Sequence, residues 1–178
     1  MLETGDTGLI LIDVQEKLAR VIHERDAVIA NMVKLVRGLQ VLSVPILWAE
    51  QNPDGLGPTV PELAELLPGE PIPKVSFSCC GEPRLVEAFE ALGRTDVLLA
   101  GIEAHVCVYQ TARDLIDRGA RVHVVADAVG SRTPENRDLA LQAMRDAGAR
   151  LTGTEMALFE LLQVADGPAF REILRIVK

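Results

Sequence analysis

The sequence predicts an α/β protein in which helices cover both faces of a six-stranded, mainly parallel sheet, a three-layer, Rossmann-like arrangement. Short apolar runs alternate with longer amphipathic segments along the 178 residues. The apolar runs are too short for helices and are rich in strand-forming residues. Polar residues follow several of these runs, as expected where parallel strands end at one edge of a sheet. We expect residues 1–178 to form a single domain of this kind.

Strand-forming runs recur at intervals that leave room for a helix between most of them. Pro45 stands near the start of the second run, where a strand tolerates proline. The predicted strands are Gly8–Ile12, Val44–Trp48, a strand within Pro71–Phe77, Thr95–Ala100, Arg121–Ala126 and a short strand near Arg150–Leu151.

Helical spacing of apolar residues and clear end signals predict the helices. Thr133 and Pro134 form a cap and a first-position proline, and Gly119 is a normal helix stop. Three prolines and two glycines within Asn52–Pro61 predict a loop. The predicted helices are Arg25–Leu42, Glu62–Leu67, Glu82–Leu92, His105–Arg118, Pro134–Ala147, Glu155–Val164 and Pro168–Val177.

The composition excludes several classes of function. The net charge of −8 and the absence of a basic run argue against nucleic acid as a partner. No apolar run approaches the roughly 20 residues of a membrane span, and the first residues lack the pattern of a signal peptide. Three cysteines, two of them adjacent, do not form a disulfide framework. We therefore expect a cytoplasmic protein that does not bind membranes.

Three reactive side chains lie at or near the ends of predicted strands: Asp13, Lys74 and Cys107. Cys107 follows an apolar strand, a glycine turn at Gly101 and the start of a helix. A helix start stabilises a thiolate, which is the nucleophilic form of cysteine. Taken singly, each residue also has an ordinary structural interpretation, as a core cysteine, a capping aspartate or an edge lysine.

Three segments together resemble the signature blocks of the isochorismatase-like cysteine hydrolases, and the similarity covers nearly the whole chain. They are Leu9–Gln15, Pro73–Phe77 and Gly101–Val108, and Ala49–Gln51 and Val124–Ala128 point to the isochorismatase-domain-containing group. The resemblance implies a catalytic triad of Asp13, Lys74 and Cys107. Cys107 would attack an acyl group, Asp13 would transfer the proton, and Lys74 would keep Asp13 ionised.

The resemblance also implies a cis peptide bond between Ile102 and Glu103 and an oxyanion hole formed by the backbone N–H groups of Glu103 and Cys107. Relatives of this kind are often homo-oligomers, so we expect the chain to assemble with copies of itself.

Metal-dependent relatives carry histidines after the second strand, but Ala49–Gly55 contains none. We therefore expect no metal and no cofactor, and nucleotide-binding glycine motifs are absent as well. Candidate substrate-binding residues are Gln15, Trp48, Gln51 and His105, although ordinary surface or core positions are equally consistent with these residues. Cys79 and Cys80 are interpreted as structural residues.

These features predict a cysteine-dependent hydrolase that cleaves a small amide, imide or related carbonyl compound through a thioester on Cys107. Two alternatives use the same fold. The chain could be a catalytically silent oligomeric interaction protein, or a thiol redox sensor in which Cys107 is oxidised.

Overall fold

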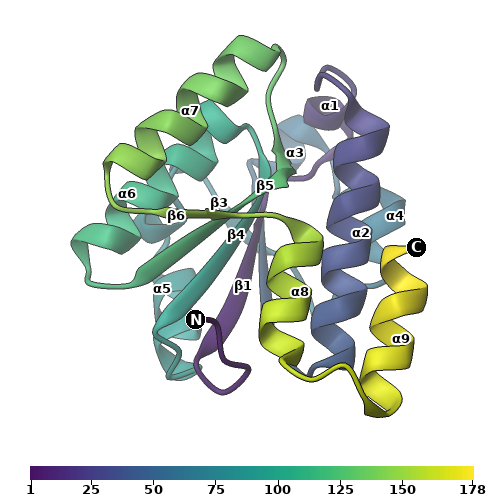
Figure 1. The fold of residues 1–178 in the computed structure, drawn as a ribbon. Helices are drawn as coiled ribbons and strands as arrows, with labels where there is room; N and C mark the ends of the chain where they lie inside the picture. Colours follow the sequence, from purple (N-terminus) through teal and green to yellow (C-terminus); the bar gives the residue numbers. More distant parts are fainter.

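The computed structural model describes residues 1–178 as a three-layer α/β/α molecule (Figure 1). The six strands form one sheet in the order β3-β2-β1-β4-β5-β6. Every pairing in the sheet is parallel. The predicted fold class is therefore confirmed, and the sheet is parallel throughout.

The strands are β1 (Thr7–Ile12), β2 (Ile46–Gln51), β3 (Ile72–Lys74), β4 (Asp96–Ile102), β5 (Arg121–Gly130) and β6 (Arg150–Thr152). The helices are α1 (Glu16–Ala19), α2 (Arg25–Val41), α3 (Pro53–Leu56), α4 (Pro61–Ala64), α5 (Pro83–Ala91), α6 (Tyr109–Asp117), α7 (Pro134–Asp146), α8 (Thr154–Leu162) and α9 (Gly167–Val177). A 3-10 turn (Cys79–Gly81) precedes α5, and a π-helical turn (Ala104–Val108) precedes α6.

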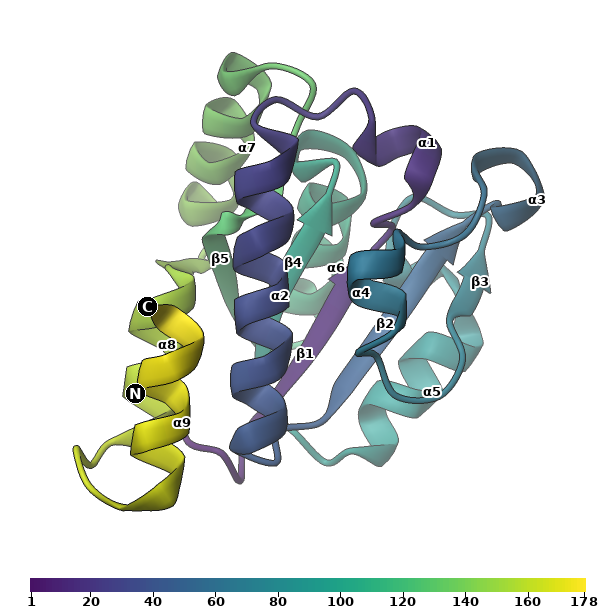
Figure 2. The same ribbon diagram turned by 90° about the vertical axis from the view of Figure 1, so that its right-hand side faces the viewer.

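Two groups of helices bury the two faces of the sheet (Figures 1 and 2). Helices α2, α4, α8 and α9 cover one face, and α5, α6 and α7 cover the other. Each interface has its own aliphatic core, one around Leu35 and Leu98 and the other around Leu99 and Met144. No helix combines the length and apolar character needed to cross a membrane.

The order of the strands reverses between β1 and β4, which are paired along their length. Strands β2 and β3 lie on one side of this point and β5 and β6 on the other. In open parallel sheets such a reversal opens a crevice beyond the carboxyl ends of the two central strands. Asp13 immediately follows β1, and the turn that contains Cys107 follows β4.

Gly101 is a strand residue, so its prediction as a turn is wrong. It pairs with Ile12 inside β4, and β4 continues to Ile102. Its φ of 129° is a backbone conformation that glycine adopts without steric strain. A Cβ at this position would lie 2.1 Å from the Ile12 carbonyl oxygen. The absence of a side chain at Gly101 therefore allows β4 to lie close to the end of β1.

Other boundaries differ where packing, rather than local sequence, decides them. The predicted helix His105–Arg118 begins as the π-helical turn and becomes α-helical only at Tyr109. The predicted loop Asn52–Pro61 contains the short helix α3, which has proline at its first position. Strand β5 extends to Gly130 because it pairs with β4 again after a register shift near Leu99.

Candidate active site

Asp13 occupies a strained and buried position at the carboxyl end of β1. Its φ is 54°, in the left-handed region that non-glycine residues seldom adopt. Its backbone N–H donates to the Ala49 carbonyl oxygen at 3.1 Å, which fixes it against β2. The side chain is fully buried, and its Oδ1 atom has no hydrogen-bond partner. Such strain is typical of functional positions.

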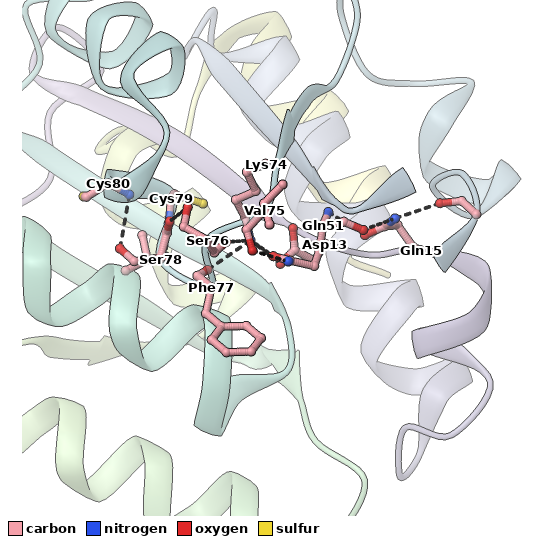
Figure 3. Close-up of polar contacts among 12 residues, drawn as sticks. Asp13, Gln15, Gln51, Lys74, Val75, Ser76, Phe77, Ser78, Cys79 and Cys80 are labelled. Atoms are coloured by element: carbon pink, nitrogen blue, oxygen red, sulfur yellow. Dashed lines mark hydrogen bonds and ion pairs between the residues drawn. The ribbon is translucent and has the colours of Figure 1, made fainter. Parts of the chain in front are cut away.

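Lys74, the last residue of β3, reaches Asp13 across β2 (Figure 3). Its ammonium group donates to Asp13 Oδ2 at 2.7 Å, in an ion pair whose two side chains are both inaccessible to solvent. The same ammonium donates to Gln51 Oε1 at 2.8 Å and to the carbonyl oxygens of Ser76 and Phe77 at 3.1 and 3.0 Å. The loop after β3 thus holds the lysine at the aspartate.

Cys107 approaches the same carboxylate from β4. The peptide bond between Ile102 and Glu103 is cis, and the π-helical turn that follows carries the cysteine. The Cys107 side chain is almost completely buried, and it interacts with the carboxylate of Asp13. The structure therefore brings together Asp13, Lys74 and Cys107 from the ends of three strands.

Burial dominates the protonation of this cluster. It raises the pKa of Asp13 above the ordinary value, although the ammonium of Lys74 acts in the opposite direction. Burial, followed by the negative charge of Asp13, strongly raises the pKa of the Cys107 thiol. The expectation of a thiolate stabilised by a helix start is therefore wrong in direction: burial and the Asp13 carboxylate both oppose ionisation of the thiol, so its ionisation calls for a base.

Glu103 presents an unused backbone donor beside Cys107. Its carbonyl oxygen accepts from the N–H groups of Val106 and Val108 at 3.1 and 3.3 Å, but its own N–H has no hydrogen-bond partner. The Glu103 carboxylate forms a 2.9 Å ion pair with Arg132. His105, half-buried in the same turn, lies 3.0 Å from the Ser131 hydroxyl through its Nδ1. The segment after β5 thus fastens the turn.

Three of the residues suggested as substrate ligands form hydrogen bonds within the chain. The Gln15 amide donates to the carbonyl oxygens of Gln51 and Gly57 and accepts from the Gln51 N–H, which leaves it no free donor. Trp48 belongs to the core beneath α2 and donates to the Pro68 carbonyl oxygen. The Gln51 amide is occupied by Lys74 and by the Val75 carbonyl oxygen, so it acts on the lysine.

Glu50 is a buried acid of the site that the sequence reasoning did not single out. Its carboxylate accepts from the Thr59 N–H and hydroxyl at 2.7 and 2.8 Å and contributes to the raised pKa of Asp13. The available signal was a charged residue inside the apolar strand Ile46–Gln51.

The other two cysteines differ from Cys107. Cys79 is completely buried, its N–H donates to the Thr111 hydroxyl, and burial raises its pKa to about 12. Cys80 is half-buried on the side of α6. No set of three or more histidine, cysteine, aspartate or glutamate side chains is arranged to bind a metal ion.

Comparisons with known proteins agree with this architecture. A family model described as the isochorismatase domain matches residues 7–156. Isochorismatase domain-containing protein 2 of Danio rerio is 42% identical over 178 residues, which are 99% of this chain and 89% of that protein.

Two solved structures are similar over almost the whole chain. The MAR1 ribonuclease of Caenorhabditis elegans superposes with a TM-score of 0.92 at 39% identity, over 99% of this chain and 91% of that one. YcaC of Escherichia coli is described as an octameric hydrolase of unknown specificity. It superposes with a TM-score of 0.93 at 27% identity, over 98% of this chain and 88% of that one.

Proposed function

Because the chain belongs to the isochorismatase family, we propose that it is a cysteine-dependent hydrolase of a small amide, imide or related carbonyl compound. The observation that carries the proposal is the buried ion pair of Lys74 and Asp13, whose carboxylate also faces the Cys107 thiol. A nucleophile, a proton acceptor and a fixed positive charge are the groups that acyl transfer to sulfur requires.

Acylation begins when Asp13 accepts the thiol proton and the Cys107 sulfur attacks the carbonyl carbon. The carbonyl oxygen becomes an oxyanion, which accepts hydrogen bonds from the backbone N–H groups of Glu103 and Cys107. The unpartnered N–H of Glu103 supports this role. As the C–N bond breaks, Asp13 returns its proton to the leaving nitrogen, and a thioester remains on Cys107.

Deacylation uses the same groups in reverse. Asp13, ionised again, accepts a proton from water while the water oxygen attacks the thioester carbon. The C–S bond breaks, the carboxylic acid leaves, and the sulfur recovers its proton from Asp13. The raised pKa of Asp13 suits this exchange, because a base and acid of intermediate pKa can both take and return a proton. No cofactor takes part.

The acidic character of the chain supports a small-molecule substrate. A net charge of −8 disfavours binding of RNA, whose backbone attracts clustered lysine and arginine. Because the Caenorhabditis elegans relative is named a ribonuclease, RNA cleavage is the competing activity that the experiments should test. The three free cysteines fit a reducing cytoplasmic compartment, which keeps Cys107 as a thiol.

The proposal is tested by screening small amides and imides and then trapping the acyl group. We expect the best substrate, quenched in acid during turnover, to leave an acyl adduct on Cys107 that mass spectrometry detects. Cys107→Ser should abolish turnover and the adduct, whereas Cys79→Ser should change neither. Turnover that survives in Cys107→Ser, or cleavage of RNA in place of amides, would refute the proposal.

Asp13→Asn separates the nucleophile from its base. We expect amide hydrolysis to fall by about 10²–10⁴-fold, because the leaving nitrogen loses its proton donor. Alkylation of Cys107 by iodoacetamide at pH 7 should become faster, since the carboxylate that raises the pKa of the thiol is gone and Lys74 remains. Hydrolysis that survives this change would show that Asp13 is not the base.

The two alternatives give different results in the amide screen and in a treatment with peroxide. A silent interaction protein would show neither turnover nor an acyl adduct on any amide of the panel. A thiol redox sensor would also fail to hydrolyse amides, but dilute hydrogen peroxide would convert Cys107 reversibly to a sulfenic acid.

A further inference from the structure

A pocket lies between α5 and α6, and none of the proposed catalytic residues lines it. It encloses about 440 Å³, a volume within the range of small-molecule sites. Its apolar wall includes Leu85, Phe89 and Leu115, which also belong to the core on this face of the sheet. Small residues at Gly93 and Gly119 leave the pocket open at the turns that follow the two helices.

The arginine-lined end of the pocket and the catalytic cluster lie at opposite ends of the sheet. Its lining residues Thr95 and Ala120 stand immediately before β4 and β5, whereas Cys107 follows the carboxyl end of β4. Strand β4 is seven residues long, so the two ends are about 20 Å apart. A ligand at the arginine-lined end of the pocket would not touch the proposed nucleophile.

Two arginines give the pocket a positive end. Arg94 and Arg118 both line it, and neither guanidinium forms an ion pair with a carboxylate of this acidic chain. The Nε of Arg94 has no hydrogen-bond partner within the chain. The guanidinium forms one hydrogen bond, from Nη1 to the Thr4 carbonyl oxygen at 3.5 Å. The other N–H groups of this guanidinium have no acceptor within the chain and can donate to a ligand.

We infer that this pocket binds a small carboxylate with an apolar body. The body would lie against the wall formed by Leu85, Phe89 and Leu115, and the carboxylate would accept hydrogen bonds from Arg94 and Arg118. Glu90 is the one carboxylate among the lining residues and opposes such a ligand. The two guanidinium groups outnumber it, so the charge of the pocket still favours an anion.

The test compares 4-phenylbutyrate with 4-phenyl-1-butanol, which has the same apolar body without the charge. Binding is measured by titration calorimetry, and occupancy of the pocket by protection of Cys80, a lining residue, from alkylation by N-ethylmaleimide. We expect the carboxylate to bind about tenfold more tightly than the alcohol and to slow the modification of Cys80.

Variants at the positive end decide whether the charge is responsible. In Arg94→Gln/Arg118→Gln the acid and the alcohol should bind equally, whereas Glu90→Gln should tighten binding of the acid. Equal binding of acid and alcohol to the unaltered protein would overturn the inference. So would protection of Cys107 in place of Cys80, or protection of Cys80 that rises with protein concentration alone and so indicates a second copy in the pocket.

Discussion

Asp13 is the residue on which the proposed chemistry depends, and three separate features of the structure act on it. Its left-handed backbone holds the buried carboxylate at the end of β1, Lys74 neutralises one oxygen, and the other oxygen accepts no hydrogen bond. Full burial explains why the pKa of this carboxyl is raised despite the adjacent ammonium. The group is therefore able to exchange protons with a thiol.

The charge of Lys74 should set the acid limb of the pH–rate profile. In the proposed mechanism hydrolysis requires ionised Asp13, so we expect kcat/KM to be lost as pH falls through the pKa of that group, which lies above its ordinary value. In Lys74→Met the ammonium that lowers this pKa is absent, and we expect the limb to move to higher pH by at least about one unit. The exposed C-terminal Lys178→Met is the control, and an unmoved limb in Lys74→Met would contradict the electrostatic role of Lys74.

At the scale of single residues, the sequence predicts which side chains meet at the carboxyl ends of the strands but not their protonation. Strand ends and family blocks identify Asp13, Lys74 and Cys107 without knowledge of distances. The pKa of Cys107 depends on burial and on a carboxylate that is remote in sequence, and neither is visible in the local pattern. The same limit explains the misplaced roles of Gln15 and Trp48, whose partners Gly57 and Pro68 lie in distant loops.

At the scale of elements, the contact between β1 and β4 determines the geometry of the site. Strand interiors and most helices could be predicted, because hydrophobic periodicity and capping residues are local signals. The ends of β4 and β5 and the π-helical turn could not, because they depend on register between strands that are distant in sequence. These less predictable ends carry Ile102, Glu103 and Cys107.

Gly101→Ala tests the importance of this contact. A Cβ at Gly101 would meet the Ile12 carbonyl oxygen at 2.1 Å, so β1 and β4 must separate next to Asp13. We expect the free energy of unfolding in urea to fall by at least about 3 kcal/mol and turnover to be lost. Gly69→Ala, which also has positive φ but no atom within 4 Å of the added methyl group, should cost only about 1 kcal/mol. Equal losses in the two variants would contradict the contact.

At the scale of the whole molecule, a polar cluster that is buried at Asp96 and His123 and exposed at Arg121 links β4 and β5 at the amino ends of the strands. Asp96 accepts from Arg121 Nε at 3.0 Å and contacts His123 Nε2 at 2.8 Å. Burial alone would raise the pKa of Asp96, but the bonds from Arg121 and His123 outweigh it and hold the pKa below its ordinary value. Ionised Asp96 therefore stabilises the fold at neutral pH, and this contribution is lost as pH falls through its lowered pKa.

Asp96→Asn should consequently destabilise the protein in a pH-dependent manner. We expect a loss of about 2 kcal/mol in the free energy of unfolding at pH 7, measured in urea, and a smaller loss at pH 3. Asp138→Asn removes a carboxylate from a largely exposed ion pair with Arg137 and should change stability little at either pH. An equal loss at pH 7 and pH 3 in Asp96→Asn would contradict the role of its charge.

The exposed segment after Lys74 predicts how the chain assembles. Val75 and Phe77 are 84% and 53% exposed, although the Phe77 carbonyl oxygen holds the ammonium of Lys74. We expect a second copy of the chain to cover these apolar side chains and shield the site. Light scattering after size exclusion should then give a mass that is a multiple of 19.3 kDa. Phe77→Glu should lower this mass, whereas Leu139→Glu, at an exposed position of α7, should leave it unchanged. A measured mass of 19.3 kDa for the unaltered protein would refute this assembly.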